Sequence, residues 1–165
     1  ILMRSLNAEQ SAKWMEKGNI LLHPTEGVWG LGCDPFNLKS IERVFELKGR
    51  EREKKFILLF RDLDSVNLYS DMILKKSVIS TFWPGHNSII IPANKLIPEY
   101  LTHKSSFLAR VSDHSPIIKL HEYLNGPFIS TSANISGQDV PESLVSIIKL
   151  FSYCLLYTSD AADEE

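Results

Sequence analysis

The sequence predicts an α/β fold, with a single domain built on an open, twisted, mixed sheet. Apolar strand-like runs alternate with amphipathic helical segments along the chain, which is typical of this class. A length of 165 residues suits one domain with a sizeable core, and no repeat or linker divides it before the extreme C-terminus. Two short connections, over residues 83–92 and 105–112, add some antiparallel pairing to the predicted sheet.

The first half of the chain alternates helix and strand signals in a regular order. Asn7 followed by Gln10 is a capping pair at the start of a short amphipathic helix, which Gly18 ends. The next apolar run leads into a glycine-rich loop. The predicted elements of this half are a helix over 7–18, a strand over 20–23, a loop over 25–32, a helix over 38–48 and a strand over 56–60.

The second half continues this alternation. Pro116 and Pro141 each lie near the predicted first turn of a helix, a position that tolerates the missing N–H of proline. The predicted elements are a helix over 71–82, strands over 88–91 and 107–111, a helix over 116–124, a strand over 127–129 and a helix over 141–151. After residue 156 the chain becomes acidic and loses periodicity, so we expect residues 157–165 to be a disordered or non-native tail.

Composition excludes several function classes. The chain is 44% hydrophobic and 23% charged, with a net charge of −2, which argues against binding nucleic acid over the whole surface. Its two cysteines, Cys33 and Cys154, form neither a disulfide framework nor a zinc motif, and favour a reduced, cytoplasmic setting. No apolar run approaches the roughly 18 residues of a membrane helix.

A cluster of cations follows the helix predicted over residues 38–48. Lys48, Arg50, Lys54 and Lys55 lie close together around Gly49. One interpretation is purely structural, because glycine ends helices and cations favour their C-termini. The other is a phosphate site, in which arginine binds through two parallel hydrogen bonds and lysine acts as a point charge.

The segment 130–137, with sequence S-T-S-A-N-I-S-G, is the stronger indication of a ligand site. It places five hydroxyl or amide side chains directly after an apolar strand. A helix cap would explain one of them, not all, and ligands of α/β sheets bind at strand ends. Arg110 interrupts another apolar strand, where it forms either an ion pair or a carboxylate site.

Other common sites have little support. The glycines of residues 25–32 do not follow the dinucleotide-binding order, and the chain contains no Walker or G-x-S-x-G sequence. His23 and His114 flank motif segments, where we expect hydrogen-bonding or packing roles rather than general-base roles.

Taken together, these segments resemble the YrdC/TsaC family of threonylcarbamoyl-AMP synthases over roughly residues 8–148, and the chain is most similar to the family's shorter, single-domain members. The matching motifs are H-P-T-E-G at 23–27 with W-G-L-G at 29–32, L-K-G-R at 47–50, F-W-P-G at 82–85, A-R-V at 109–111 and S-T-S-A-N-I-S-G at 130–137. The resemblance implies a YrdC-like sheet around a large concave cleft. Two departures are His23, where the family usually has tyrosine, and Gly27, where it usually has threonine or alanine.

The resemblance further implies that L-threonine, bicarbonate and ATP react to give threonylcarbamoyl-AMP and pyrophosphate. A TsaD-like partner complex would then modify tRNA. The implied catalytic residues are Lys48, Arg50, Ser132 and Asn134. The implied ATP-binding residues are these four and Lys54, with Mg²⁺ carried by the nucleotide rather than by side chains. The implied threonine-binding residues are Thr25, Gly27, Arg110 and Ser130.

The resemblance also sets the expected extent of the domain. We expect residues 1–156 to form the YrdC-like domain. The C-terminal part of the family pattern, a stretch resembling G-G-x-x-S-E-I-R-D, is not found in this sequence. If that part is missing, we expect activity to be reduced. The alternative function is an RNA-binding module that holds double-stranded RNA or tRNA without catalysis, which the acidic balance disfavours.

Overall fold

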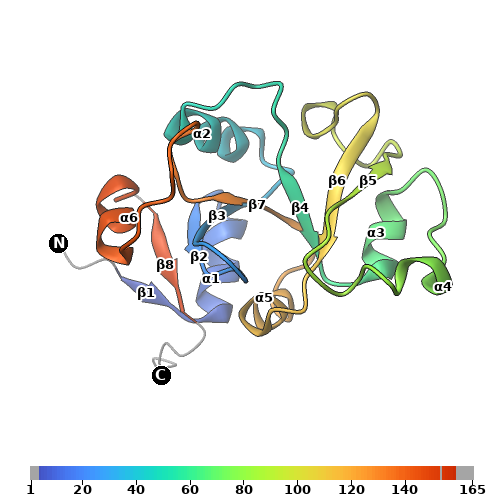
Figure 1. Ribbon diagram of the computed structural model, residues 1–165, viewed down its shortest axis with the longest axis horizontal. Helices are drawn as coiled ribbons and strands as arrows, with labels where there is room; N and C mark the ends of the chain where they lie inside the picture. The colour runs from blue at the N-terminus through green and yellow to red at the C-terminus, as the bar shows by residue number, and fades with distance from the viewer. Residues whose placement is uncertain (1–3, 153, 159–165) are drawn as a thin grey trace.

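The computed structural model describes residues 4–152 and 154–158 of the chain. An eight-stranded sheet crosses this part of the molecule in the order β1-β8-β2-β3-β7-β4-β6-β5 (Figure 1). Its strands are β1 (Ser5–Leu6), β2 (Leu21–His23), β3 (Gly30–Cys33), β4 (Ile57–Phe60), β5 (Ile89–Pro92), β6 (Ser106–Val111), β7 (Phe128–Ser132) and β8 (Leu155–Tyr157). The helices are α1 (Ala8–Glu16), α2 (Leu38–Lys48), α3 (Leu63–Tyr69), α4 (Lys76–Ile79), α5 (Ser115–His121) and α6 (Leu144–Leu150), with a short 3-10 helix at Glu99–Leu101.

The sheet is mixed, as the sequence predicts. Strand β4 runs parallel to β6, whereas β7 is antiparallel to both of its neighbours, β3 and β4. The outer strand β5 is antiparallel to β6. Three strands that carry candidate motifs, β3, β7 and β6, therefore lie close together, with β4 between β7 and β6.

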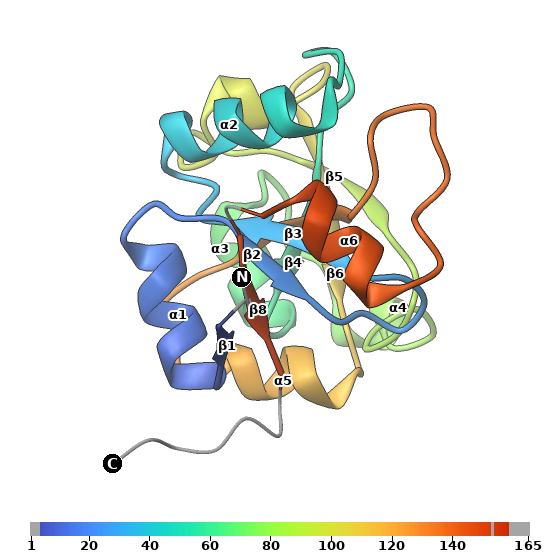
Figure 2. The ribbon, with the colours of Figure 1, turned by 90° about the vertical axis from the view of Figure 1, so that its left-hand side faces the viewer.

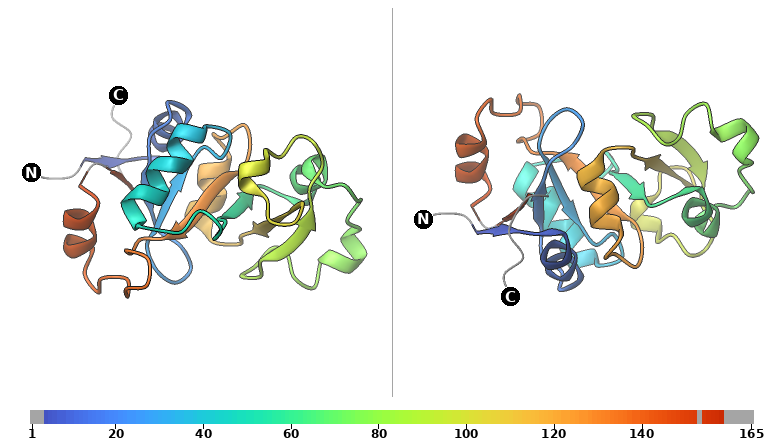
Figure 3. Two further views of the ribbon diagram at one scale, coloured as in Figure 1. Left: turned by 90° about the horizontal axis from the view of Figure 1, so that it is seen from above. Right: turned by 90° about the horizontal axis from the view of Figure 1, so that it is seen from below.

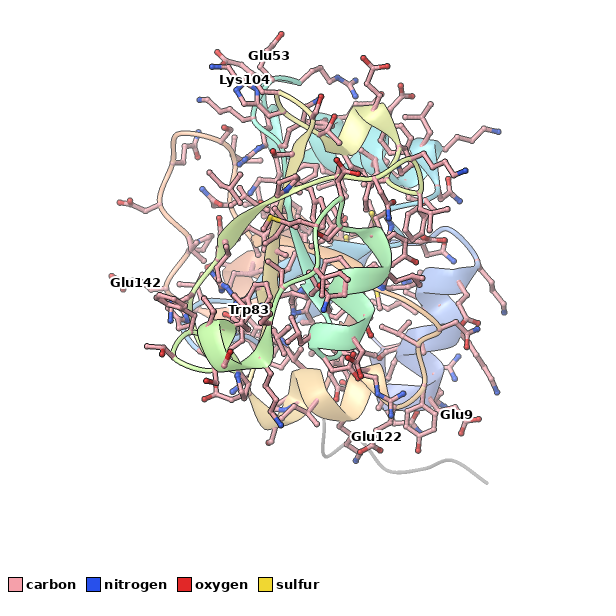
Figure 4. All side chains as sticks on the ribbon, turned by 90° about the vertical axis from the view of Figure 1, so that its right-hand side faces the viewer. Glu9, Glu53, Trp83, Lys104, Glu122 and Glu142 are labelled. Carbon is pink, nitrogen blue, oxygen red and sulfur yellow. The ribbon has the colours of Figure 1, made fainter. Side chains whose placement is uncertain are left out.

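Helices cover both faces of the sheet. On one face, Leu21, Leu59 and Phe128 form a core with residues of α1 and α5. On the other face, alternate strand residues such as Leu31 and Leu58 pack with α2, α3 and α6. Figures 2 and 3 show α2 on one side of the sheet and α1 and α5 on the other. Figure 4 shows the labelled charged side chains at the rim of the molecule, while Trp83 lies inside and is buried.

The first two helices lie where they were predicted, and the predicted capping pair of α1 is confirmed. Asn7 and Gln10 form a reciprocal capping box at the start of α1. Asn37 accepts from Ser40 N at the start of α2, and Gly49 ends α2 in the left-handed region at φ 58°. Among the described residues, no helix is long and apolar enough to cross a membrane.

The central part of the chain departs from prediction. Of the helix predicted over 71–82, only α4 (Lys76–Ile79) is helical, and α3 (Leu63–Tyr69) was not predicted at all. Asp62 begins α3 by accepting from Ser65 N at 2.8 Å. The predicted loop over 25–32 ends early, because β3 begins at Gly30. Helix α6 is capped by Ser143, so Pro141 lies before it rather than in its first turn.

The predicted start of the C-terminal tail, at residue 157, lies too early in the chain. Tyr157 is buried within β8, and its hydroxyl donates to Pro116 O at 2.7 Å. Thr158 N donates to Leu6 O, which continues the edge of the sheet. The sequence does not show this because β1 and β8 are very short and depend on pairing with each other. Residues 159–165 of the predicted tail lie outside the described residues.

Two buried histidines predict acid sensitivity. His23 and His121 both pack against Phe128, and burial lowers the pKa of each to about 4. Between about pH 6.5 and 4 the unfolded chain therefore binds more protons than the folded chain, so the free energy of unfolding falls on acidification. Denaturant titrations across this window should show a slope of up to roughly 1.4 kcal/mol per pH unit for each histidine.

His121→Leu separates this effect from general acid denaturation. The pH dependence of the free energy of unfolding should be shallower in this variant by up to roughly 1.4 kcal/mol per pH unit, because one buried titrating ring is gone. His103→Leu is the matched control, since His103 is exposed. An unchanged slope in His121→Leu would contradict the explanation.

Candidate functional site

The side chains of Lys48 and Arg50, at the C-terminal end of α2, point in different directions. Lys48 is the last residue of the helix, and the left-handed Gly49 turns the chain immediately after it. Gly49 N and Arg50 N donate back to Glu46 O and Phe45 O. The structural interpretation of this glycine is therefore confirmed, and the same turn separates the two side chains.

Lys48 points inward and is almost fully buried. Its Nζ donates to Ser132 O and, at 3.0 Å each, to Asn134 O and Asn134 Oδ1. An ammonium group has three donors, so all of them are used within the protein. Burial, with a further contribution from Arg50, lowers the pKa of Lys48 to about 8. Lys48 thus fixes the 130–137 segment from behind.

Arg50 points toward solvent from the other side of this turn. Its Nε donates to Lys54 O at 2.8 Å, its Nη2 donates to Lys55 O at 3.0 Å, and the guanidinium lies 5.0 Å from the centre of the Phe56 ring. Glu53, labelled in Figure 4, marks the outer edge of this loop. Three of the five guanidinium N–H groups are left for a ligand. Arg50 is therefore a fixed cation rather than a mobile one.

The 130–137 segment begins within a strand. Ser130 and Ser132 belong to β7, not to a loop after it as predicted. They are two residues apart, so both face the same side of the sheet. Asn134 follows the strand, and its Oδ1 accepts from Ser132 Oγ at 2.5 Å as well as from Lys48. Its Nδ2 donates to Ile135 O and Gln138 O. Asn134 is thus used to build the loop.

Arg110 projects from β6 on the same face as Ser130. Its Nε and Nη2 donate to Ser88 Oγ at 3.0 and 2.8 Å. Among the described residues no carboxylate lies within ion-pair distance of Arg110, so the ion-pair interpretation is wrong. Its Nη1 group remains available to an anion.

The 25–28 loop closes one side of the site. Thr25 Oγ1 donates to Val28 O and accepts from Gly27 N at 3.2 Å. Glu26 accepts a hydrogen bond from Ser112 Oγ. Burial opposes ionisation of Glu26, but this hydrogen bond and nearby positive charge keep its pKa below the ordinary value. The loop is thereby tied to the end of β6.

These elements enclose an open pocket of about 420 Å³. Six of the predicted site residues line it together: Thr25, Gly27, Arg50, Arg110, Ser130 and Ser132. Three predicted residues do not. Lys48 and Asn134 support the pocket from behind, and Lys54 is exposed and paired with Glu51 at 3.5 Å. The large concave cleft implied by the family resemblance stays a prediction.

Sequence reasoning missed several residues of the pocket. Lys55 and His86 line it, and Ser88 holds Arg110 in place. Val28, Trp29, Phe56 and Ile57 supply apolar walls. Lys55 belonged to the predicted cation cluster but was given no role in the site, and no pattern indicated Ser88. A separate hollow of about 310 Å³, lined by residues such as Phe36 and Tyr69, contains none of the predicted site residues.

The chemistry of the pocket suits an anionic ligand with an apolar part. Two guanidinium groups, Arg50 and Arg110, line it together with neutral hydroxyls. Guanidinium groups bind carboxylates and phosphates through charge-assisted hydrogen bonds. The described residues contain no group of three or more His, Cys, Asp or Glu side chains that could hold a metal ion. The pocket therefore presents two cationic groups to a ligand.

Comparison with known proteins gives consistent sequence relatives. The Sua5/YciO/YrdC family model, described as telomere recombination, matches residues 13–161. A Pseudomonas fluorescens protein named threonylcarbamoyl-AMP synthase is 34% identical over 155 residues, covering 91% of this chain and 82% of the relative. A Pseudomonas aeruginosa protein of the same name is 32% identical over the same shares.

Solved structures share the fold. Sua5 from P. abyssi superposes with a TM-score of 0.84 at 23% identity, covering 96% of this chain and 53% of Sua5. E. coli YciO gives 0.82 at 21% identity, covering 96% of this chain and 84% of YciO. The chain thus spans about half the length of Sua5. One P. abyssi Sua5 structure, with a TM-score of 0.83, is a complex with L-threonine.

Proposed function

The chain belongs to the Sua5/YciO/YrdC family, and we propose on this premise that it is a threonylcarbamoyl-AMP synthase. The enzyme would convert L-threonine, bicarbonate and ATP to threonylcarbamoyl-AMP and pyrophosphate. The observation that carries the proposal is the pocket in which Arg50 and Arg110 face one space. A TsaD-like complex would use the product to modify an adenosine of tRNA in the cytoplasm.

The reaction joins two anions, which explains the need for fixed cations. The amine of threonine and bicarbonate form a carbamate with loss of water. A carbamate oxygen then attacks the α-phosphorus of ATP, and the bond to pyrophosphate breaks. Repulsion between the reacting groups is the main obstacle, so positioning and electrostatic stabilisation supply the catalysis. No protein nucleophile is required.

The two guanidinium groups take separate tasks in this proposal. Arg50, held by two backbone carbonyls, would bind the triphosphate. Arg110, held by Ser88, would bind the carboxylate of threonine, with Ser130 and the Thr25–Gly27 backbone beside it. Ser132 would turn its proton from Asn134 Oδ1 to a phosphate oxygen.

Lys48 and Asn134 would act indirectly, by positioning other residues rather than by contacting the ligand. The ammonium of Lys48 is fully hydrogen-bonded to residues 132 and 134 and does not line the pocket. We therefore place both residues as positioning groups for Ser132. Lys54 is exposed and outside the pocket lining, so it would contribute only long-range charge. Mg²⁺ would enter with ATP on phosphate oxygens and water.

The comparisons favour the synthase over the RNA-binding alternative. The curated relatives carry the name of a small-molecule enzyme over most of this chain. In this proposal, any contact of the chain with tRNA would serve the threonylcarbamoyl modification rather than a separate RNA-binding function.

Arg110→Ala tests the threonine side of the pocket. Calorimetry should show L-threonine binding weakened by roughly 100-fold, since a charge-assisted hydrogen bond contributes about 1.5–3 kcal/mol. ATP affinity should stay within about twofold, because Arg50 is unaltered. Ser88→Ala should cause a smaller loss, about fivefold, by releasing the guanidinium. Equal threonine affinity in Arg110→Ala and wild type would rule out this assignment.

A further inference from the structure

His23 reaches across a neighbouring strand to the pocket. It lies on β2, where its backbone pairs with Gly30 of β3. Its Nε2 lies 3.2 Å from Ser130 Oγ on β7, the strand beyond β3. The ring is fully buried and packs edge-on against Phe128 at 5.4 Å between centroids. His23, which does not line the pocket, is therefore in contact with Ser130, which does.

Two glycines of β3 make this reach possible. A Cβ on Gly30 would lie 2.9 Å from His23 Cε1, and one on Gly32 would lie 3.1 Å from His23 Cδ2. Real Cβ atoms are scarcely ever found at the shorter distance, so Gly30 cannot carry a side chain while His23 keeps this position. Because Gly30 and Gly32 are two residues apart, both lie on the same face of β3, and the absence of their side chains leaves room for the His23 ring.

The contacts of the ring decide which tautomer its neutral form takes. His23 Nδ1 lies 3.0 Å from Pro24 O, and a carbonyl oxygen only accepts hydrogen bonds. Nδ1 must therefore carry the proton. In a neutral imidazole the other nitrogen is then an acceptor, so Ser130 Oγ donates its proton to Nε2. Burial supports the neutral form by lowering the pKa of His23 to about 4.

We propose that His23 is a positioning residue that fixes Ser130 as a hydrogen-bond acceptor toward the pocket. The lone pairs of Ser130 Oγ then face the ligand, while its proton faces His23. The pocket would accept a donor at this point: the amine or the β-hydroxyl of the amino-acid substrate, beside the carboxylate held by Arg110. This inference rests on the proposed function for its ligand, but not for the direction of the hydrogen bond.

The direction of the hydrogen bond is measured by ¹⁵N NMR of the histidine rings at pH 7. We expect His23 Nδ1 to be protonated and Nε2 to be unprotonated. Gly30→Ala should shift these signals by displacing the ring, whereas Gly126→Ala should not, because a Cβ there meets only Tyr69 Oη at 3.9 Å. A protonated Nε2 in the wild type would overturn the proposal.

The consequence for binding is measured by calorimetry with L-threonine and with L-2-aminobutyrate, which keeps the amine and lacks the hydroxyl. Ser130→Ala should weaken L-threonine about 10-fold. An equal loss for both ligands would identify the amine as the donor, and a loss for threonine alone the hydroxyl. No loss for either ligand would overturn the proposal.

Two substitutions of His23 distinguish positioning from packing. His23→Phe keeps an aromatic ring without an acceptor and should weaken threonine about as much as Ser130→Ala does. The double variant should be no weaker than Ser130→Ala alone. His23→Gln can accept from Ser130 and should recover most of the affinity. Additive losses, or failure of His23→Gln to recover while its melting temperature matches that of His23→Phe, would overturn the proposal.

Failure of the proposed function gives a different result. If the wild type bound no L-threonine, the synthase assignment and its amino-acid ligand would both be wrong. The NMR measurement would still decide the orientation of Ser130, because it requires no ligand.

Discussion

Replacing Arg50 by alanine is expected to weaken ATP binding by at least about 100-fold. The guanidinium has three free N–H groups, and each charge-assisted hydrogen bond to phosphate contributes about 1.5–3 kcal/mol. Its other N–H groups and the Phe56 ring hold it in place before the ligand arrives, so little conformational entropy is lost on binding. Calorimetric titration with ATP measures the effect directly.

Two further variants define the cause of this loss. Arg50→Lys keeps the charge but not the planar donor geometry, and should recover only part of the affinity. Arg52→Ala is the matched control, because it removes one positive charge from the same loop without altering the pocket lining. If Arg52→Ala weakened ATP as much as Arg50→Ala, net charge rather than a specific contact would be responsible.

Replacing Lys48 by methionine is expected to destabilise the fold by roughly 3–5 kcal/mol. Methionine fills a similar volume but removes the shared donor of Ser132 O, Asn134 O and Asn134 Oδ1. Ser132 O and Asn134 Oδ1 keep Asn134 N and Ser132 Oγ as donors, whereas Asn134 O loses its donor. Each hydrogen bond from a charged donor contributes about 1.5–3 kcal/mol, and a buried acceptor left unpaired costs about 1–3 kcal/mol. ATP binding should also weaken at low temperature, where the variant is folded, because Ser132 loses its support. Urea unfolding and calorimetry give the two readouts.

Lys39→Met provides the control for this prediction. Lys39 lies on the same helix but is exposed, so its loss should change stability by less than about 0.5 kcal/mol. A Lys48→Met variant as stable as Lys39→Met would show that the hydrogen bonds of Lys48 are not those that hold the 130–137 segment.

Local signals decided how much of the fold was predictable. Helix α2 was predicted over its observed range because its apolar stripe and Gly49 agree, although its Asn37 cap was not noticed. Helix α3 was missed because it has only seven residues, LDSVNLY, and buries only Val66 among them, so Asp62 is its single clear signal. Strands β1 and β8 have only two and three residues, and they exist through pairing that no local pattern encodes.

The candidate site was predictable as a set of residues but not as an arrangement. Short motifs indicated which segments bind, and six predicted residues do line one pocket. The inward direction of Lys48 depends on where α2 packs against the 130–137 segment, which sequence spacing does not reveal. Likewise the glycines of residues 25–32 predicted a loop, whereas Gly30 and Gly32 lie in β3 and make room for His23.

The most direct test of the proposed synthase is pyrophosphate release from ATP, measured with L-threonine and bicarbonate and with each substrate omitted in turn. The proposal predicts release that requires all three and that falls by at least about 100-fold in Arg50→Ala at subsaturating ATP. Release that is absent, or that is indifferent to L-threonine, would contradict it.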